Sequence, residues 1–427
     1  MPKFLLYTYG CALNQAKAEK IRGLLNIWQV QEVSDLQDAN IVIINTCIVK
    51  NTTEHKIFHQ ISSIHQNHPD KLLVVTGCLP EINTLLKKLP KDVVHLSYIQ
   101  DLPKALNLSQ HPDCKEREKP SLDFQPRVRT NPLVAIIPIA QGCLSNCSYC
   151  IVKKVKGHLH SYDPSIIIQE VKQSLKEGVK EIQFTAQDTA VYGKDIETNL
   201  PKLLIETLKL PGDYRVRIGM MNPRFAKHII EDLIQVMQND SRIYRFLHLP
   251  IQSGNDRILK EMNRHYTVKE YKILLQYIKN SLKEFTFSTD IIVGFPGESD
   301  EEFQDTIQLI QKIQPDIVNI SRFGARPETR AQKMKNQILS QTKKQRSREL
   351  THLCQEIALN KNLKYQNKVR RCLILERGNN PNEWKGRDDS YKPILVSSPT
   401  NLLGKFVQVR ISNVGVAYLR GVLQKSN

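Results

Sequence analysis

The chain has no long apolar segment. None of its uninterrupted apolar runs approaches the roughly 20 residues that a helix needs to cross a bilayer. Its first residues, Met1-Pro2-Lys3-Phe4, lack the apolar region and cleavage site of a signal peptide. Hydrophobic residues make up 40% of the composition and charged residues 24%, which is typical of a soluble globular protein. We therefore expect a cytoplasmic protein, and the 427 residues predict two to three domains.

Acidic residues are scarce toward the carboxyl end of the chain. Residues 331–427 contain 19 Lys and Arg but only 6 Asp and Glu, whereas residues 1–330 contain 42 and 37. A basic surplus concentrated in one terminal region is typical of a protein that binds a polyanion such as RNA. The alternative is a solvated basic face without a partner. An anionic membrane is less favoured as the partner, because no amphipathic anchor accompanies the charge.

The nine cysteines lack the usual zinc patterns, which are paired C-x2-C halves or C-x2-C with two histidines. Cys143, Cys147 and Cys150 instead lie in one loop at C-x3-C-x2-C spacing. In a reducing compartment, clustered cysteines indicate metal or redox ligands rather than disulfides. Because iron–sulfur cubanes normally take four thiolates, three would leave one iron open for a small molecule. The alternatives are a zinc site completed by His158 or His160, and inert buried thiols.

A second group of cysteines follows predicted strands. In residues 1–100, apolar strands alternate with helices, which predicts an open parallel sheet with helices on both faces. The expected strands are 3–9, 40–45, 72–76 and 93–96, and the expected helices 14–25, 53–65 and 81–89. Cys11, Cys47 and Cys78 directly follow the first three strands and should converge, since ligands gather at the carboxyl ends of parallel strands. The alternative is a chance placement of three buried structural cysteines.

The middle of the chain predicts a partial barrel. Six strands are each followed by a helix, two units short of a complete (β/α)8 barrel. The expected strands are 133–140, 181–185, 215–219, 246–250, 286–293 and 317–323. The expected helices are 164–175, 200–208, 226–237, 256–262, 268–279 and 300–314. Because the three-cysteine loop leaves the first strand, it should lie at the carboxyl face, where barrel active sites are found.

Polar residues follow the other strands of this barrel. They include Gln187 and Asp188 after the second strand, Asn222 after the third, and Gln252 and Ser253 after the fourth. Singly, such residues are ordinary helix caps. Together around one mouth they predict a polar pocket for a small molecule.

The remaining segments complete the domain plan. A polar, proline-marked stretch predicts a linker over 113–130, with Cys114 as an exposed bystander. A basic helix is expected over 342–360, and short β-like runs at 368–376, 393–396, 404–411 and 417–422 predict a small antiparallel barrel that could bind nucleic acid. Cys354 and Cys372 are interpreted as packing residues. The domains are therefore expected at 1–112, 131–366 and 367–427.

Over nearly its whole length the sequence resembles radical S-adenosylmethionine (SAM) methylthiotransferases, and its last segment resembles the RNA-binding TRAM domain. The resemblance implies an α/β fold with a partial (β/α)6 barrel and two [4Fe-4S] clusters. One cluster would be held by Cys143, Cys147 and Cys150 with SAM on its open iron, and an auxiliary cluster would serve sulfur insertion. The cofactor and cluster residues that the resemblance implies are Gln187, Asp188, Asn222, Gln252 and Ser253 for SAM, and Cys11, Cys47 and Cys78 for the auxiliary cluster.

Several stretches resemble the archaeal and eukaryotic branch that acts on threonylcarbamoyladenosine at position 37 of tRNA, namely 157–164, 185–195, 218–223 and 321–327. An aromatic C–H bond has no acidic proton for a base to remove, so a radical made from SAM with one electron suits this substrate. The implied partners are the tRNA anticodon loop and an electron donor, with no membrane. The alternatives are a methylthiotransferase for isopentenyladenosine or a ribosomal-protein aspartate, a non-catalytic iron–sulfur RNA-binding protein, and a zinc-containing RNA-binding module.

Overall fold

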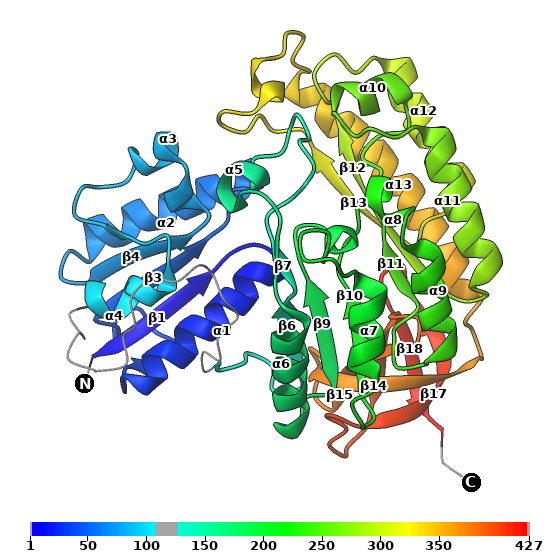
Figure 1. The fold of residues 1–427 in the computed structure, drawn as a ribbon, viewed down its shortest axis with the longest axis horizontal. Coiled ribbons are helices and arrows are strands. Elements are labelled where there is room, and N and C mark those ends of the chain that lie inside the picture. Colours follow the sequence, from blue (N-terminus) through cyan, green and yellow to red (C-terminus); the bar gives the residue numbers. More distant parts are fainter. Residues whose placement is uncertain (1, 107–126, 425–427) are drawn as a thin grey trace.

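The computed structural model describes residues 2–106 and 127–424, which form an amino-terminal α/β unit, a half-barrel and a small β-barrel (Figure 1). Most of the predicted linker over 113–130, and Cys114 with it, lies outside the described residues. Within those described ranges, no helix is both long and apolar enough to cross a membrane.

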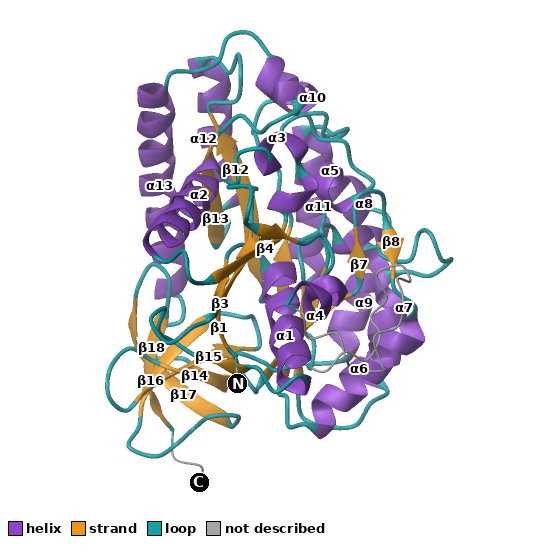
Figure 2. Ribbon diagram, turned by 90° about the vertical axis from the view of Figure 1, so that its left-hand side faces the viewer, coloured by secondary structure: helices purple, strands orange, loops and turns teal. Residues whose placement is uncertain are grey.

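The amino-terminal sheet is parallel, with the strand order β2-β1-β3-β4-β5. Its strands are β1 (Lys3–Thr8), β2 (Gln31–Glu32), β3 (Ile41–Thr46), β4 (Leu72–Gly77) and β5 (Val94–His95). Helix α1 (Ala12–Ile27) packs Ile21 and Leu25 on one face, and α2 (Asn51–Asn67) packs Ile57 and Ile61 on the other (Figure 2). The prediction of helices on both faces is confirmed. The helix expected over 81–89 is shorter and is divided into η1 (Leu79–Glu81) and α3 (Asn83–Leu86).

The six predicted barrel strands are all present and parallel. They form the sheets β10-β9-β6 and β11-β12-β13, which the parallel bridge between Val216 and Ile243 joins into one half-barrel. These strands are β6 (Val134–Pro138), β9 (Glu181–Thr185), β10 (Arg215–Ile218), β11 (Phe246–His248), β12 (Thr286–Val293) and β13 (Ile317–Arg322). Their apolar side chains and those of the outer helices form one continuous core.

The outer helices begin at polar capping residues. The Asp163 side chain accepts the Ser165 N–H at 2.7 Å, so α6 starts at the proline where the sequence predicted it. The helices are α6 (Pro164–Lys176), α7 (Leu200–Leu208), α8 (Pro223–Ala226), α9 (Ile230–Asn239), α10 (Asp256–Glu261), α11 (Val268–Ser281) and α12 (Asp300–Ile313). The helix expected over 226–237 is α9 and begins four residues later than predicted, because Asn222 caps a separate short helix, α8, before it.

After the long helix α13 (Ser340–Leu363), five strands form a closed barrel in the order β14-β15-β16-β18-β17. They are β14 (Val369–Arg377), β15 (Glu383–Asp388), β16 (Pro393–Ser397), β17 (Phe406–Val414) and β18 (Leu419–Leu423). The sequence runs did not include β15, and the expectation of purely antiparallel pairing was wrong, because β16 and β18 pair in parallel. Closure needs this one parallel pairing, since β18 returns beside β16 to seal the sheet.

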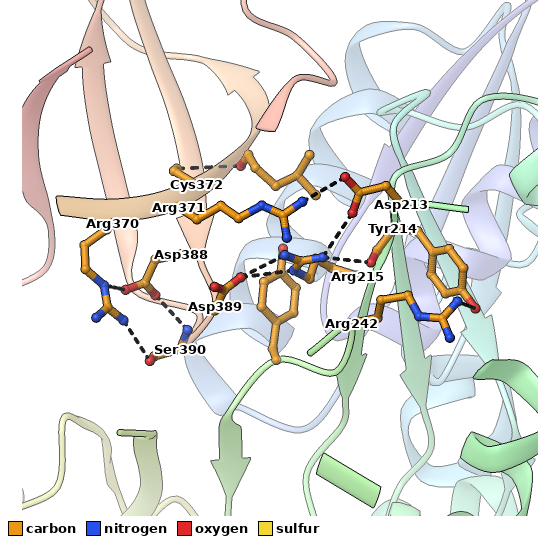
Figure 3. Close-up of polar contacts among 12 residues, drawn as sticks. Asp213, Tyr214, Arg215, Arg242, Arg370, Arg371, Cys372, Asp388, Asp389 and Ser390 are labelled. Atoms are coloured by element: carbon orange, nitrogen blue, oxygen red, sulfur yellow. Dashed lines mark hydrogen bonds and ion pairs between the residues drawn. The ribbon is translucent and has the colours of Figure 1, made fainter. Parts of the chain in front are cut away.

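Ion pairs fasten the small barrel to the half-barrel. Figure 3 shows Arg215 of β10, which is only 1% exposed, donating to Asp389 at 2.9 Å. In the same view Arg371 of β14 donates to Asp213 at 2.8 Å. Lys392, also buried, donates to Asp316 at 2.7 Å. Because removing one partner of a buried ion pair leaves an uncompensated charge, these contacts hold the two barrels in a defined orientation.

Candidate functional site

The three-cysteine loop runs from β7 (Ala140–Gln141) to α5 (Val152–Lys156), and its three thiols are half-buried. The Ser145 N–H donates to the Cys143 sulfur at 3.3 Å, and Cys147 O accepts the N–H of Cys150 at 3.2 Å. Burial raises the pKa of Cys150 to about 12, and its Cys147 and Cys143 neighbours add to this shift. Burial also raises the pKa of Cys143. Three adjacent thiols suit a metal centre, because a bound cation holds its cysteine ligands as thiolates.

A glycine fixes the entry to this loop. Gly142 has a φ of +82°, and a Cβ at this position would lie 1.8 Å from the carbonyl oxygen of His158. That close approach follows the short antiparallel pairing of β7 with β8 (His160–Ser161). Any larger residue at position 142 would push the two segments apart and displace the cysteines that follow.

Arg264 is a residue of this site that the sequence analysis missed. The residue is 5% exposed, and its guanidinium donates to the Cys147 sulfur at 3.3 Å. It also donates to the Pro250 carbonyl at 2.8 Å, to Asn222 Oδ1 at 3.3 Å and to Tyr266 Oη at 2.9 Å. Hydrogen bonds to ligating sulfurs are one of the factors that set the potential of an iron–sulfur cluster.

The backbone around Arg264 explains why no sequence pattern indicated it. Its neighbours Asn263 and His265 both have left-handed backbone conformations, with φ values of 60° and 56°. Such conformations outside glycine cost energy and concentrate at functional sites. An isolated arginine in a turn has neither helical nor strand periodicity, so the only sequence signal was an Asn just after a helix, which is a common left-handed cap.

The polar residues at the strand ends form a network behind the cysteine loop. Asp188 Oδ1 accepts the N–H groups of Ala190 at 3.1 Å and of Asn222 at 3.0 Å. The Asn222 side chain caps α8 and donates to Ser145 Oγ at 2.8 Å. The capping interpretation is therefore confirmed for Asp188 and Asn222. Asn222 links the barrel to the cysteine loop itself.

Two buried oxygens of this network have no hydrogen-bond partner among the described residues. They are Gln187 Oε1 and Asp188 Oδ2. Burial raises the pKa of Asp188 to about 6, although the donated N–H groups of Asn222 and Ala190 oppose the shift. Unpaired buried acceptors are costly, so a bound cationic donor such as an ammonium group would relieve both.

The other predicted polar residues lie beside a cavity of about 850 Å³. Gln252 lines it, is 8% exposed, and has a left-handed φ of 82°, which marks a second strained position at this site. Ser253 is fully buried, and its Oγ accepts the Asn255 N–H at 3.3 Å. The cavity is bounded by the cysteine loop at 149–152, by β12 and β13, and by residues 49–52 of the amino-terminal unit.

The amino-terminal cysteines lie at one edge of their sheet. Cys47 and Cys78 are buried and Cys11 is exposed. The Cys78 N–H donates to the carbonyl of Thr46 at 3.0 Å, and a Cβ on Gly10 would lie 2.8 Å from the Cys47 sulfur. Burial raises the pKa of Cys47 to about 11, and the nearby Cys78 and Cys11 thiols raise it further. The structure thus brings together three residues that are far apart in sequence.

Among the described residues, no three His, Cys, Asp or Glu side chains are arranged to ligate a single metal ion. The two cysteine groups nevertheless fit the [4Fe-4S] clusters that the resemblance implies, because their ligand atoms are thiols alone. Each group lies at the carboxyl edge of a parallel sheet. Thiolates are the ligands of [4Fe-4S] clusters, in which each sulfur binds a different iron. The Ser145 N–H donates a hydrogen bond to the Cys143 sulfur and Arg264 donates one to the Cys147 sulfur, as suits thiolate ligands.

The two cysteine groups are fastened to each other. Ile151 and Val155, just after Cys150, pack into the core of the amino-terminal unit together with Ile48 and Cys78. Arg326, from the segment after β13, forms an ion pair with Glu54 of α2. The cysteine loop of the half-barrel is therefore anchored in the same hydrophobic core as Cys78 of the second cysteine group.

Comparison with known families divides the chain into three parts. Residues 3–97 match an uncharacterized protein family, UPF0004. Residues 137–310 match the Radical SAM superfamily, and residues 363–423 match the TRAM domain. The fold agrees with a solved structure of the cobalamin-dependent SAM radical enzyme OxsB, with a TM-score of 0.52 at 10% identity, covering 84% of this chain and 56% of that one.

Full-length relatives define the family more closely. A probable threonylcarbamoyladenosine tRNA methylthiotransferase of Pyrococcus horikoshii is 38% identical, covering 99% of both chains. The human threonylcarbamoyladenosine tRNA methylthiotransferase is 32% identical over 98% of this chain and 73% of that protein. A tRNA-2-methylthio-N6-dimethylallyladenosine synthase of Dictyoglomus thermophilum is 34% identical over 99% and 98%. The protein therefore belongs to the family of threonylcarbamoyladenosine tRNA methylthiotransferases within the radical SAM superfamily.

Proposed function

We propose that the protein adds a methylthio group to C2 of N6-threonylcarbamoyladenosine at position 37 of tRNA, using SAM and two [4Fe-4S] clusters. The observation that carries this proposal is the cavity of about 850 Å³, because residues of both cysteine-bearing units line it. A methylthio transfer needs a radical source and a sulfur source that reach the same atom. One cavity bounded by both cysteine segments provides that arrangement.

Each cysteine group has its own role in this proposal. Cys143, Cys147 and Cys150 hold the cluster that, when bound, supplies one electron to SAM. Cys11, Cys47 and Cys78 hold the auxiliary cluster for sulfur insertion. The chain's own residues then position these groups: Arg264 donates to Cys147, and α5 is fixed in the amino-terminal core. Fixing reactants in one geometry supplies much of the catalysis that a protein adds to a cofactor.

SAM binding is assigned to the residues at the barrel mouth. Gln187 and Asp188 present their unpaired buried oxygens to the ammonium group of SAM. Gln252 contacts SAM from the cavity wall, while Asn222 and Ser253 support it from behind. A cation placed beside Asp188 would favour its ionised form and offset the burial that now raises its pKa.

The affinity for SAM should therefore depend on pH through Asp188. The pKa of this carboxyl is about 6, so protonation competes with binding of the ammonium group below that pH. The dissociation constant should be constant from about pH 8 to pH 6.5 and rise about tenfold per pH unit well below pH 6. Equilibrium binding of SAM to the anaerobic protein measures this. Asp188→Asn should bind SAM more weakly at neutral pH and show no such rise; an equal rise in that variant would contradict the assignment.

We place the remaining partners as follows. Residues 1–112 carry the auxiliary cluster, 131–366 carry SAM, and 367–427 bind the tRNA, with 113–130 as the linker. The anticodon loop is the part of the tRNA that is recognised, because single-stranded loops present unstacked bases. An electron donor is required to reduce the clusters. The protein acts in the cytoplasm, where its tRNA substrate is found, and needs no membrane.

The direct test is mass spectrometry of tRNA nucleosides from cells with and without the protein. We expect the 2-methylthio derivative of threonylcarbamoyladenosine to disappear when the protein is absent and its unmodified precursor to accumulate. Loss of methylthio-isopentenyladenosine instead would assign the protein to the other tRNA substrate. Unchanged nucleosides would refute both, and a ribosomal protein would become the substrate to examine.

A further inference from the structure

A second large cavity lies between the half-barrel and the small carboxyl-terminal barrel. Its volume is about 920 Å³, and β10, β11, β12, β13 and α13 form one side while β15, β16 and the turn before β18 form the other. It contains none of the proposed cluster or SAM residues. It does share Asn319 and Ile320 with the cavity beside the cysteine loop, so the two cavities are neighbours along β13.

Three arginines of this cavity have no ion-pair partner within the described part of the chain. They are Arg217, Arg377 and Arg387, and each rests on an aromatic ring instead. The guanidinium carbons of Arg217 and Arg387 lie 5.2 Å and 4.6 Å from the centroid of the same Tyr391 ring. Arg217 Nε is buried, and no residue that the structure describes forms a hydrogen bond with it. These guanidiniums are therefore held in place while their hydrogen-bond donors stay available.

The carboxylates of the cavity wall are already paired. Asp316 bonds to Lys392 and Lys361, Glu376 to Lys385, and Glu383 to Arg420. Glu181, behind the wall, accepts from Tyr244 at 2.8 Å. Burial raises its pKa, while the charges of Arg387 and Arg217, which form no ion pair with it, oppose that shift. The cavity thus presents unpaired positive charge, which an anionic ligand would neutralise.

An exposed aromatic ring completes the cavity. Tyr418, in the turn before β18, is 42% exposed and lines the cavity. Exposed tyrosines next to basic groups are typical stacking platforms for unpaired bases. The ion pairs in Figure 3, which dock the small barrel through Arg215 and Arg371, hold this platform at a defined place opposite β10.

We propose that this cavity binds one unstacked nucleotide of the tRNA other than the target adenosine, with its phosphate on Arg217 and Arg387 and its base against Tyr418. The inference rests on the proposed function, since the two cavities adjoin at Asn319 and Ile320, where a strand whose adenosine occupies the cavity at the cysteine loop can pass into this one. Capture of a second nucleotide would fix the register of the loop and so determine which adenosine enters the catalytic cavity.

The test uses a synthetic anticodon stem-loop that carries threonylcarbamoyladenosine, and a set in which each other loop nucleotide in turn is made abasic. For wild-type protein, one abasic position should raise the dissociation constant about tenfold, as expected for losing a stacked base. In Tyr418→Ala the same substitution should have less than about a twofold effect. Tyr277→Ala is the matched control, because Tyr277 is 38% exposed on the outer helix α11. It should retain the wild-type penalty.

The charges are tested separately with Arg387→Gln and Arg217→Gln. Each should lower the slope of log affinity against log salt by about 0.7, the value for one contact to a single-stranded phosphate. Arg410→Gln is the control, because Arg410 is an exposed arginine of β17 that does not line the cavity. It should leave the Tyr418-dependent abasic penalty intact.

The inference is overturned if no abasic position depends on Tyr418, or if adenosine monophosphate binds as tightly as the stem-loop in an Arg387-dependent manner. The second result would mark a site for a small nucleotide. Formation of the methylthio product on the same stem-loop is followed in parallel. If wild-type protein makes the product but no abasic penalty depends on Tyr418, the inference fails while the proposed function stands. If wild-type protein makes no product, the proposed function itself fails.

Discussion

Replacing Cys147 with alanine is expected to abolish the formation of 5′-deoxyadenosine from SAM under strongly reducing conditions. The proposed cluster has three protein ligands, so losing one leaves too few thiolates to retain it. The substitution also removes the acceptor of the Arg264 guanidinium, which donates to this sulfur at 3.3 Å. Changes even to groups behind a metal ligand typically cost 10–100-fold, so loss of the ligand itself should reduce cleavage by more than about 100-fold.

The measurements are chromatographic quantification of deoxyadenosine and iron analysis of anaerobically prepared protein. The variant should contain about four irons where the wild type contains about eight. Cys354→Ala is the matched control, because Cys354 is half-buried on α13 and packs against the barrel core, away from both cysteine groups. Undiminished cleavage by Cys147→Ala, or an equal loss in the control, would remove the assignment of this loop as the SAM-cleaving centre.

The sequence predicted helices and strands well wherever apolar residues follow a regular pattern. Buried parallel strands are continuous apolar runs, and all six strands of the half-barrel were predicted to within a few residues. The same rule predicted that Cys11, Cys47 and Cys78 would approach each other, since the carboxyl ends of adjacent parallel strands lie side by side. The family that the sequence resembles is confirmed by the full-length relatives.

The contacts that assemble the site could not be predicted in this way. Arg264 reaches Cys147 from a turn 117 residues away, and nothing local distinguishes it from a surface arginine. Strand β15 was missed because its buried side chains include Glu383 and Asp388, so it has no apolar alternation. Asp388 is tolerated there because Arg370 donates to it at 2.9 Å. A buried charge is tolerated only beside a partner. Because that partner comes from a distant segment, the local sequence does not reveal it.

Replacing Cys47 with alanine should separate the two halves of the reaction. Because Cys47 belongs to the auxiliary group, the variant should still cleave SAM at close to the wild-type rate but form no methylthio nucleoside. Alanine is preferable to serine, since Cys47 is 6% exposed and a serine hydroxyl would be buried there without an assured partner. Alanine also keeps the Cβ that Gly10 packs against, so the cost in stability should be limited to about 1 kcal/mol.

This separation is a demanding test because the two cysteine groups share structural support. Ile151 and Val155 of the cysteine loop pack in the same core as Cys78, so general collapse of the amino-terminal unit would also disturb SAM cleavage. Deoxyadenosine formation by Cys47→Ala therefore serves as an internal measure of folding. Loss of both products would indicate collapse of the amino-terminal unit. Cys78→Ala and Cys11→Ala would then separate collapse from loss of the cluster, since Cys11 is exposed and its replacement leaves the core unchanged. Normal methylthio product from Cys11→Ala and Cys47→Ala alike would show that sulfur insertion does not use this group, because each variant keeps only two of the three thiolates that would hold the cluster.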